Sequence, residues 1–477
     1  MTDISKYEAV IGIEVHAELK TATKIFCSCR TDFGAEPNTL CCPVCMGLPG
    51  ALPVLNSRVV ELAVLAGLAL NCNIAKECCH DRKNYFYPDL PKAYQISQKD
   101  TPLCYDGYID INADGGEKRI RIERIHIEED AGKLIHSQGG VTMIDHNRCG
   151  VPLIEIVSKP DMRSSAEAKA YLEELRLTLL YAGVSDCKMN EGSMRCDLNI
   201  SVRKRGETVF NTRAEIKNLN SFSFAAKAID FELARQAEII EGGGRIDQET
   251  RRYDEHSGRT VLMRAKENSE DYRYFTEPDL PPFNVDDEWL SRIKGELPKL
   301  HRALRAELSQ KHRLSADELD PILSSPESAK YFSSAASLTK YPRILANLMI
   351  CELPALYGGE FRCPISVKNI ATLCDLQGDG KLNSSTAKAL LRELFEADAD
   401  PYALVKERGL LQIDDEAALM PVVRSVIAEN QKAVEDYKRG KTAAAKAIIG
   451  KVMAATRGRA NPTLAAKLVE NELRDNF

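Results

Sequence analysis

The sequence predicts an α+β protein in which strands dominate the first 285 residues and helices form the rest. Residues 10–21 (VIGIEVHAELKT) alternate apolar and polar side chains, which is typical of a half-buried strand. The same alternation returns at residues 193–202 (SMRCDLNISV). From about residue 286, helical patterns joined by short polar links replace the alternating segments.

Two further strands and one helix are predicted in the first part. PLIEIV (residues 152–157) is apolar on both faces except at Glu155, which indicates a central strand covered on both sides. AEIKN (residues 214–218) alternates, with Lys217 on its polar side. Residues 164–183 form a predicted helix, because a serine and a glutamate make a capping-box pair at its start and a glycine follows its last turn.

The chain divides into three predicted domains. A proline-rich break, TEPDLPPF, places the first boundary and gives domains at residues 1–285, 286–405 and 406–477. Residues 432–459 of the last domain hold eight Lys or Arg against two Asp or Glu. Four basic residues lie off an apolar helical stripe there, namely Lys446, Lys451, Arg457 and Arg459. This excess favours contact with a nucleic-acid backbone, although a merely solvated basic helix has the same pattern.

Composition limits the class of protein. A chain of 477 residues with 44% hydrophobic and 28% charged residues is expected to be globular with several domains. The net charge of −6 means that any nucleic-acid surface is local. No apolar run approaches the length of a membrane span, and the start does not read as a signal peptide. Fifteen cysteines then predict reduced thiols and a cytoplasmic location.

Two close thiol pairs predict a zinc site. Cys27 and Cys29 are separated by one residue, and Cys42 and Cys45 by two. Four thiolates in two pairs match a tetrahedral structural zinc centre, which would be closed to water. Four reduced structural thiols remain the alternative, and Cys41 is a possible competing ligand.

Several carboxylates occupy positions where they need a partner. Glu14 and His16 share the polar side of the first strand, and Glu155 interrupts the apolar run described above. The segment RIHIEED adds three consecutive acidic residues, Glu128, Glu129 and Asp130. Buried carboxylates require a cation or an ion pair, and Mg²⁺ prefers oxygen ligands. Each glutamate could instead pair with a lysine or arginine, and His16 could be a hydrogen-bonded sheet residue.

One further segment mixes cations with aromatic rings. DRKNYFYPDLPKAYQISQ (residues 81–98) interleaves Arg82, Lys83 and Lys92 with four aromatic side chains. Cations bind phosphate and aromatic faces stack on nucleic-acid bases, so the segment could hold a phosphate or a tRNA end. A tyrosine-rich loop that packs on the core is the plainer interpretation.

Together these segments resemble the GatB family, the B subunits of the GatCAB aminoacyl-tRNA amidotransferases. The resemblance covers nearly the whole chain and rests on IGIEVHAEL, FCSC with CPVCMGLPGALPVLN, DRKNYFYPDLPKAYQISQ, HIEEDAGK, NRCGVPLIEIVSKPD, EGSMRCDLNISVR, EIKNLNSF, QETRRYDE, DYRYFTEPDLPP and VEDYKRGKTAAAKAIIGKVMAATRGRANP. It implies an α+β cradle around a mainly antiparallel sheet, followed by a helical domain and a small helical tail domain. Zinc occurs in only part of this family.

The resemblance also implies an activity and a set of partners. Such a protein uses ATP to phosphorylate the side-chain carboxylate of glutamate or aspartate on a misacylated tRNA, and ammonia then forms the amide. The ammonia comes from glutamine through an amidase A subunit, and a small C subunit completes a heterotrimer. ATP and Mg²⁺ are therefore expected, with structural Zn²⁺.

The resemblance assigns roles to particular residues. It places Glu14, His16, Glu129 and Glu155 around Mg²⁺, with Lys83 facing phosphate or the charged tRNA end. It makes Asp197 and Lys217, on polar strand faces, further candidates for the catalytic site. The competing hypothesis is a zinc-stabilised RNA-binding scaffold without catalysis of its own.

Overall fold

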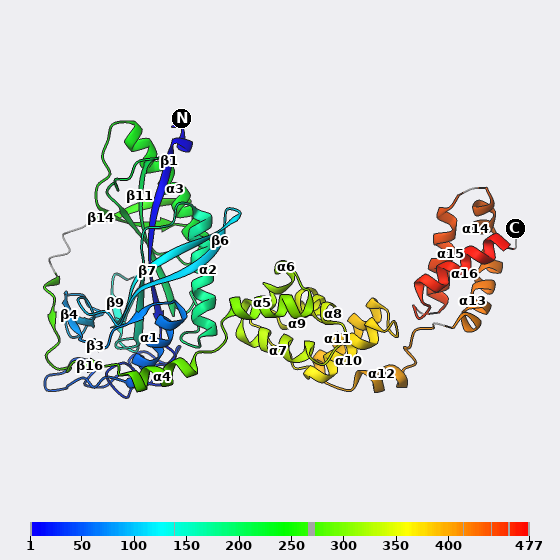
Figure 1. Ribbon diagram of the computed structural model, residues 1–477, viewed down its shortest axis with the longest axis horizontal. Helices are drawn as coiled ribbons and strands as arrows, with labels where there is room; N and C mark the ends of the chain where they lie inside the picture. Colours follow the sequence, from blue (N-terminus) through cyan, green and yellow to red (C-terminus); the bar gives the residue numbers. More distant parts are fainter. Residues whose placement is uncertain are drawn as a thin grey trace. The chain divides into compact units, whose positions relative to one another are not determined.

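The computed structural model describes residues 2–137, 139–265, 272–413, 415–439, 441–456 and 458–475 (Figure 1). The chain forms two compact units, Met1–His301 and Arg302–Phe477. Strands are concentrated in the first unit and the second is helical, so the predicted α+β class is confirmed.

A nine-stranded sheet forms the framework of the first unit. Its strands run in the order β14 (Arg259–Ala265), β13 (Glu249–Asp254), β12 (Ala214–Lys217), β11 (Met194–Lys204), β1 (Tyr7–Glu18), β10 (Pro152–Ser158), β7 (Gly116–Glu129), β6 (Cys104–Ala113) and β2 (Asn73–Ile74). Neighbours are antiparallel except β12 and β13, which are parallel. The four strands predicted from the sequence are β1, β10, β11 and β12, which lie side by side in the sheet.

Three helices cover one face of this sheet. They are α1 (Ser57–Ala69), α2 (Ser165–Tyr181) and α3 (Phe222–Glu241), and they contact β6, β7, β11 and each other. The core lies between them and the apolar side of β1, where Ile13 and Val15 are fully buried. Helix α2 begins as predicted, because the Ser164 hydroxyl accepts a hydrogen bond from the Glu167 amide at 3.1 Å.

The remaining strands form three smaller sheets. β4 (Asp81–Asn84) pairs with β5 (Tyr94–Ser97) and with β15 (Phe275–Thr276), and β5 contacts β7. Two smaller ladders are β3 (Glu77–Cys78) with β16 (Phe283–Asn284), and β8 (Lys133–His136) with β9 (Thr142–Asp145). Helix α4 (Asp287–Glu296) packs on α1 just after the predicted boundary at residue 285. The three-domain boundaries stay predictions.

The second unit is built from short helices in two groups along the chain. The first group comprises α5 (His301–His312), α6 (Ala316–Leu319), α7 (Pro326–Ala336), α8 (Pro342–Asn347), α9 (Pro354–Tyr357), α10 (Val367–Gly378), α11 (Ser384–Glu396) and α12 (Pro401–Glu407). The last four are α13 (Glu416–Glu429), α14 (Gln431–Lys438), α15 (Ala443–Ala455) and α16 (Pro462–Asp475), which share one core around Val423, Ile448 and Leu468. Among the described residues, no helix is long and apolar enough to span a membrane.

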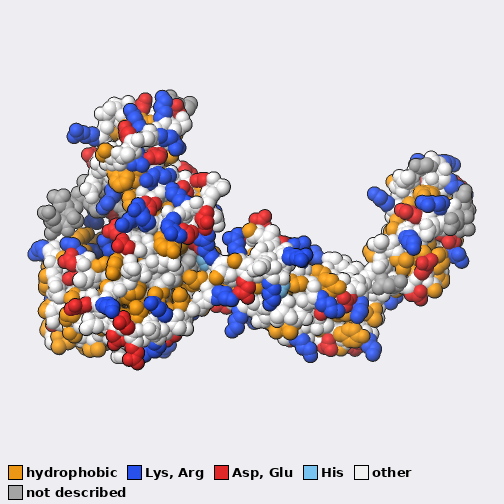
Figure 2. Space-filling model, viewed as in Figure 1, with side chains coloured by type: hydrophobic (Ala, Val, Ile, Leu, Met, Phe, Trp, Pro, Cys, Tyr) orange, Lys and Arg blue, Asp and Glu red, His pale blue; other side chains and the backbone are white. Residues whose placement is uncertain are grey.

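Charged side chains of both signs are interspersed over the visible face of each unit (Figure 2). This distribution agrees with the small net charge of −6 for the chain. On this face of the first unit, no broad field of one sign is seen that could give binding specificity by itself.

One buried histidine makes the fold sensitive to acid. His80 is 1% exposed and lies between Phe26 and Phe283, with ring centroids 5.8 and 5.4 Å away. Neither of its ring nitrogens has a hydrogen-bond partner among the described residues. Burial lowers the pKa of His80 from 6.5 to about 4, and the nearby charge of Glu277 only partly opposes the shift.

We predict a stability loss in mild acid that depends on His80. Below pH 6.5 the unfolded chain takes up a proton that the folded chain refuses until about pH 4, so stability falls as the pH drops through that window. The His80→Leu variant should lack this component. In urea unfolding at several pH values, the free energy of unfolding of the variant should rise relative to that of the wild type as the pH falls. The change should reach up to about 1.4 kcal/mol per pH unit. A constant difference between the two proteins from pH 7 to pH 4 would contradict the assignment.

Candidate active site

The register of β1 gathers charged side chains on the polar face of the sheet. Glu14 and His16 point to that face, as the alternation predicts, and both are half-buried. Antiparallel pairing sets His16 opposite Glu155 of β10 and Glu14 opposite Asp197 of β11. Side chains directly opposite each other lie close enough to interact, so pairing alone brings these four groups together.

A histidine and two carboxylates form the centre of the site. His16 Nε2 lies 3.3 Å from Glu128 Oε1 and 3.5 Å from Glu155 Oε2. Burial lowers the pKa of His16, but hydrogen bonds to both carboxylates outweigh it and raise the pKa to about 10. The two imidazoles His126 and His16 in turn hold the pKa of Glu155 well below its usual range in spite of its burial. The three side chains His16, Glu128 and Glu155 offer ligand atoms within 4.8 Å of one another, so they could hold a metal ion.

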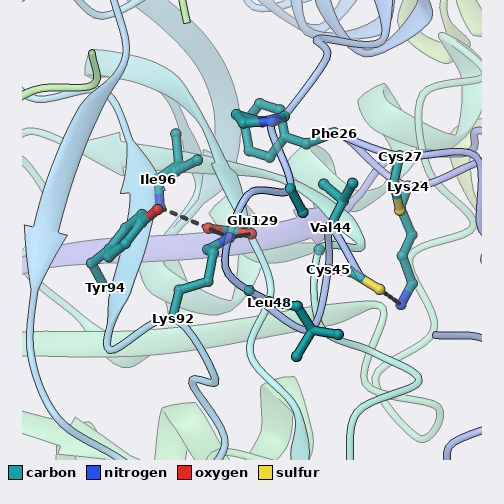
Figure 3. Close-up of a pocket in the computed structure, with 14 residues that line it drawn as sticks. Lys24, Phe26, Cys27, Val44, Cys45, Leu48, Lys92, Tyr94, Ile96 and Glu129 are labelled. Carbon is teal, nitrogen blue, oxygen red and sulfur yellow. Dashed lines mark hydrogen bonds and ion pairs between the residues drawn. The ribbon is translucent and has the colours of Figure 1, made fainter. Parts of the chain in front are cut away.

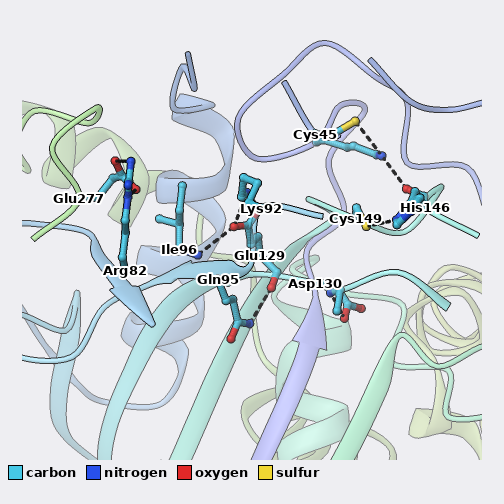
Figure 4. A network of polar contacts seen from close by, with 12 residues as sticks. Cys45, Arg82, Lys92, Gln95, Ile96, Glu129, Asp130, His146, Cys149 and Glu277 are labelled. Carbon is cyan, nitrogen blue, oxygen red and sulfur yellow. Dashed lines mark hydrogen bonds and ion pairs between the residues drawn. The ribbon is translucent and has the colours of Figure 1, made fainter. Parts of the chain in front are cut away.

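The structure does not bring Glu129 to this cluster. Strand β7 alternates to its last residue, so Glu128 faces the polar side and Glu129 faces the opposite side. The Glu129 carboxylate accepts hydrogen bonds from Lys92 Nζ at 2.6 Å and from the Ile96 amide at 2.8 Å (Figure 4). Glu129 therefore forms an internal ion pair and does not lie where it was expected to bind Mg²⁺. Glu128, and not Glu129, lies beside His16 and Glu155.

A small cavity separates this ion pair from the cysteine loop. It encloses about 160 Å³ and is lined by Glu129 and Lys92 on one side and by Cys27, Cys45 and Lys24 on the other (Figure 3). Lys92 is 13% exposed and Glu129 4% exposed at their side chains. Because both charges are largely removed from water, each depends on the other for compensation.

A second acidic group adjoins the first. Glu14, Asp197 and Glu215 offer ligand atoms within 4.8 Å of one another. Lys217 Nζ neutralises part of this charge, at 2.6 Å from Asp197 and 3.1 Å from Glu215. Burial and then the charge of Glu155 raise the pKa of Glu14, whose carboxylate accepts a hydrogen bond from Asn199 at 2.9 Å.

Members of both groups line one open cleft of about 430 Å³. Its walls include His16, Glu128 and Asp197 with the cations Lys83, Arg195 and Lys217. Burial lowers the pKa of Lys83, but the charges of Glu128 and Glu155 outweigh it and leave the pKa above the ordinary lysine value. The cleft therefore presents fixed positive charges beside a cluster of carboxylates.

The other cations of the segment at residues 81–98 are already paired. Arg82 makes two hydrogen bonds to Glu277, at 2.6 and 2.9 Å, and Lys92 binds Glu129 as described. The aromatic rings Phe86 and Tyr87 are exposed. Of the three cations predicted there, Lys83 alone lines the cleft.

The four predicted cysteines meet at one point. The Sγ atoms of Cys27, Cys29, Cys42 and Cys45 lie within 4.8 Å of one another, so this group could hold a metal ion. Cys41 stands outside it and contacts Asn147. Lys24, with no exposed surface, donates to the Leu40 carbonyl at 2.8 Å and contacts Cys45 Sγ at 3.6 Å. All fifteen cysteines are free.

The loop that carries these cysteines is fastened by a distant segment. The side-chain oxygen of Asn147 accepts a hydrogen bond from the Leu40 amide at 2.8 Å, and its side-chain nitrogen donates to the Glu36 carbonyl at 2.7 Å. The Ile25 amide donates to the Gly150 carbonyl at 2.9 Å. Residues about a hundred positions apart in the sequence therefore form one structural piece.

The basic residues of the tail differ in what they contact. Lys446 and Lys451 are exposed on α15, while Ile448 and Val452 on the same helix are buried. Arg459 is half-buried and donates to the Gly409 carbonyl at 3.0 Å. Arg457 lies outside the described residues.

The structure places three groups beside the predicted ones to which the sequence analysis assigned no role. Glu128 belonged to the acidic segment but was not assigned as a ligand, His126 stands alone in an apolar segment, and Arg195 was one of several polar residues on its strand. Period-two alternation contained a signal for each, because all three share the polar parity of their strands. Lys92 gave no such signal, because it lies in a loop and its ion pair with Glu129 does not follow from the alternation of a strand.

Comparison with protein families gives two matches. A family model described as the GatB/GatE catalytic domain matches residues 9–291, and one described as the GatB domain matches residues 330–473. The chain is 50% identical over 476 residues to a protein of Caldicellulosiruptor saccharolyticus, covering 98% of this chain and 99% of the relative. It is 52% identical over 472 residues to a protein of Caldanaerobacter subterraneus, with 98% and 99% coverage. Both relatives are named as the B subunit of an aspartyl/glutamyl-tRNA(Asn/Gln) amidotransferase.

We predict that Glu129→Gln destabilises the first unit by about 3–5 kcal/mol, because it leaves the buried ammonium of Lys92 without a counter-charge. Urea unfolding of the full chain measures this loss. Glu123→Gln is the matched control on the same strand, since the exposed pair of Glu123 with Arg124 contributes about 1 kcal/mol or less. Equal small effects of the two substitutions would show that Lys92 and Glu129 do not depend on each other.

Proposed function

We propose a function for this chain from one premise, which is that the chain belongs to the GatB/GatE family. The chain is the B subunit of a tRNA-dependent amidotransferase, an ATP-dependent carbon–nitrogen ligase. It converts glutamate or aspartate attached to a misacylated tRNA into glutamine or asparagine. The observation that carries the proposal is the cleft lined by His16, Glu128 and the cations Lys83 and Arg195, beside which Glu155 completes the possible metal-ligand group.

The chemistry requires a place for several negative charges. A side-chain carboxylate oxygen of the attached amino acid attacks the γ-phosphorus of ATP, and ADP leaves. Ammonia then attacks the carbonyl carbon of the acyl phosphate, phosphate leaves, and the nitrogen loses a proton. Lys83 and Arg195 bind the anionic groups, and the walls of the cleft limit access of water to the acyl phosphate.

The residues at the centre fit a divalent cation. Two carboxylates and one imidazole converge within 4.8 Å, and the positive charge closest to the carboxylates is the proton of His16, whose place a cation can take. We assign His16, Glu128 and Glu155 as ligands of Mg²⁺, which when bound would neutralise phosphate charge. His16 must lose its proton to become a ligand. Glu14, Asp197 and Lys217 form the adjoining wall and orient the substrate carboxylate.

The remaining proposals concern partners and the other metal. Four sulfur atoms without a competing carboxylate suit Zn²⁺, and the closed set makes it structural. Lys446 and Lys451 contact the tRNA backbone, whereas Arg459 serves mainly to hold its own segment. An amidase A subunit supplies ammonia and a small C subunit completes the heterotrimer. Fifteen free cysteines favour the cytoplasm.

A scaffold without catalysis explains less. It accounts for the thiols and the basic tail, but not for two nearly buried carboxylates converging on one imidazole in a cleft. The two functions differ in their dependence on the aminoacyl group, since a scaffold binds charged and uncharged tRNA alike.

We predict that ADP release by the assembled enzyme requires Mg²⁺ and a tRNA charged with glutamate or aspartate. Glu155→Gln keeps the shape of the side chain but removes its charge, and should lower this release by at least about 100-fold. Glu288→Gln, on the exposed side of α4, is the control and should behave as the wild type. ADP release that ignores charging of the tRNA, or survives in Glu155→Gln, would support the scaffold instead.

We also predict one zinc ion per chain. Elemental analysis of freshly reduced protein should find it in the wild type and in Cys41→Ser, because Cys41 stands outside the four-sulfur group. Cys42→Ser should lose it, together with stability of the cysteine loop. Zinc retained by Cys42→Ser, or lost equally from both variants, would refute this ligand set.

A further inference from the structure

We propose that His126 positions Glu155 for the cation that this carboxylate shares with Glu128 and His16, and that it does so as a hydrogen-bond donor from behind the cleft. The inference rests on the proposed function, because it assumes that a divalent cation binds there. It adds a residue that neither the metal-ligand set nor the lining of the cleft contains.

The position of His126 separates it from the ligands. Its Nε2 lies 3.3 Å from Glu155 Oε2 and 3.9 Å from Glu128 Oε2, so it approaches the same two carboxylates as His16. Antiparallel pairing sets it directly opposite Glu155. The side chain of His126 is 5% exposed, against 22% for His16. One imidazole therefore faces the cleft and the other is enclosed by protein.

The hydrogen bonding of His126 defines what it can do. Its Nε2–H is the group in reach of Glu155, and its buried Nδ1 has no partner among the described residues. A single donor aimed at a carboxylate oxygen restricts rotation of that carboxylate, which is how outer groups orient metal ligands. Glu155 Oε2 is shared between the two imidazoles. When a cation takes the place of the His16 proton, the bond from His126 still holds that oxygen.

Neighbouring residues on the strand explain why His126 is fixed. Ile125 and Ile127 are both fully buried in the core on the other face of β7. Their burial fixes which face of β7 is turned to the core. His126 and Glu128 therefore project from the opposite face. The imidazole is thus supported by packing that does not depend on the cation.

The test compares three variants in the full-length, zinc-loaded chain, with Mn²⁺ as the probe. His126→Phe keeps a ring and removes the donor, while His126→Gln returns an N–H near the position of Nε2. His136→Gln changes an exposed histidine of β8 and is the control. Electron paramagnetic resonance of free Mn²⁺ gives the dissociation constant. We expect His126→Phe to bind about 10- to 100-fold more weakly, His126→Gln to recover most of the affinity, and His136→Gln to match the wild type.

A second measurement separates positioning from general damage to the fold. In the assembled enzyme, His126→Phe should need more Mg²⁺ for half-maximal ADP release, and its turnover should recover at saturating Mg²⁺. If His126→Phe does not fold, His126→Asn replaces it, because its amide is too short to reach Glu155.

Unchanged Mn²⁺ affinity in His126→Phe would overturn the inference. An equal loss of Mn²⁺ affinity in His126→Phe and His126→Gln would also overturn it, because only the second variant keeps a donor. Turnover that stays low at every Mg²⁺ concentration would overturn it as well. A wild type that binds no Mn²⁺ would instead remove the metal site from the proposed function. The two failures are therefore distinguishable.

Discussion

The register of one central strand, β1, is the constraint on which the site depends. Its alternation is fixed by the core, because Ile13 and Val15 are buried under the helices. Glu14 and His16 must therefore project from the opposite face of the sheet. There they lie beside the paired residues of β10 and β11. A slip of one residue would bury the charges and expose the core side chains, so the hydrophobic core also specifies the chemistry of the cleft.

Two glutamates that are adjacent in sequence illustrate how this constraint divides roles. The Glu129 carboxylate accepts hydrogen bonds from a lysine ammonium and from a backbone amide, so its charge is compensated within the protein. Glu128 meets imidazoles and the more distant charge of Lys83. An imidazolium can release its proton, so a carboxylate paired with it is suited to binding a cation instead. A lysine ammonium keeps its charge, so a carboxylate paired with it is suited to stabilising the fold. The direction of each side chain, and not its type, sets this difference.

Much of the fold was accessible from sequence, because β1, β10, β11 and β12 all alternate or run apolar over several residues. The cysteine cluster was also predictable, since its spacing is local. The carboxylate cluster in the cleft was only partly predictable. The family resemblance assigned Glu129 to it, although the parity of the strand already set Glu129 on the opposite face from Glu128. The partner of Glu129 could not be found in this way, because Lys92 reaches it through a loop and its pairing follows no period.

The fastening of the cysteine loop has a consequence for the order in which the protein is made. Asn147 and Gly150 hold the backbone near Leu40 and Ile25, so the loop cannot be closed in this manner until they have left the ribosome. Synthesis at about 5–20 residues per second separates Cys45 from Gly150 by roughly 5–20 s. During that interval the nascent chain carries open thiols. Closure of the cysteine loop therefore has to follow the synthesis of Gly150, which lies two residues before the start of β10.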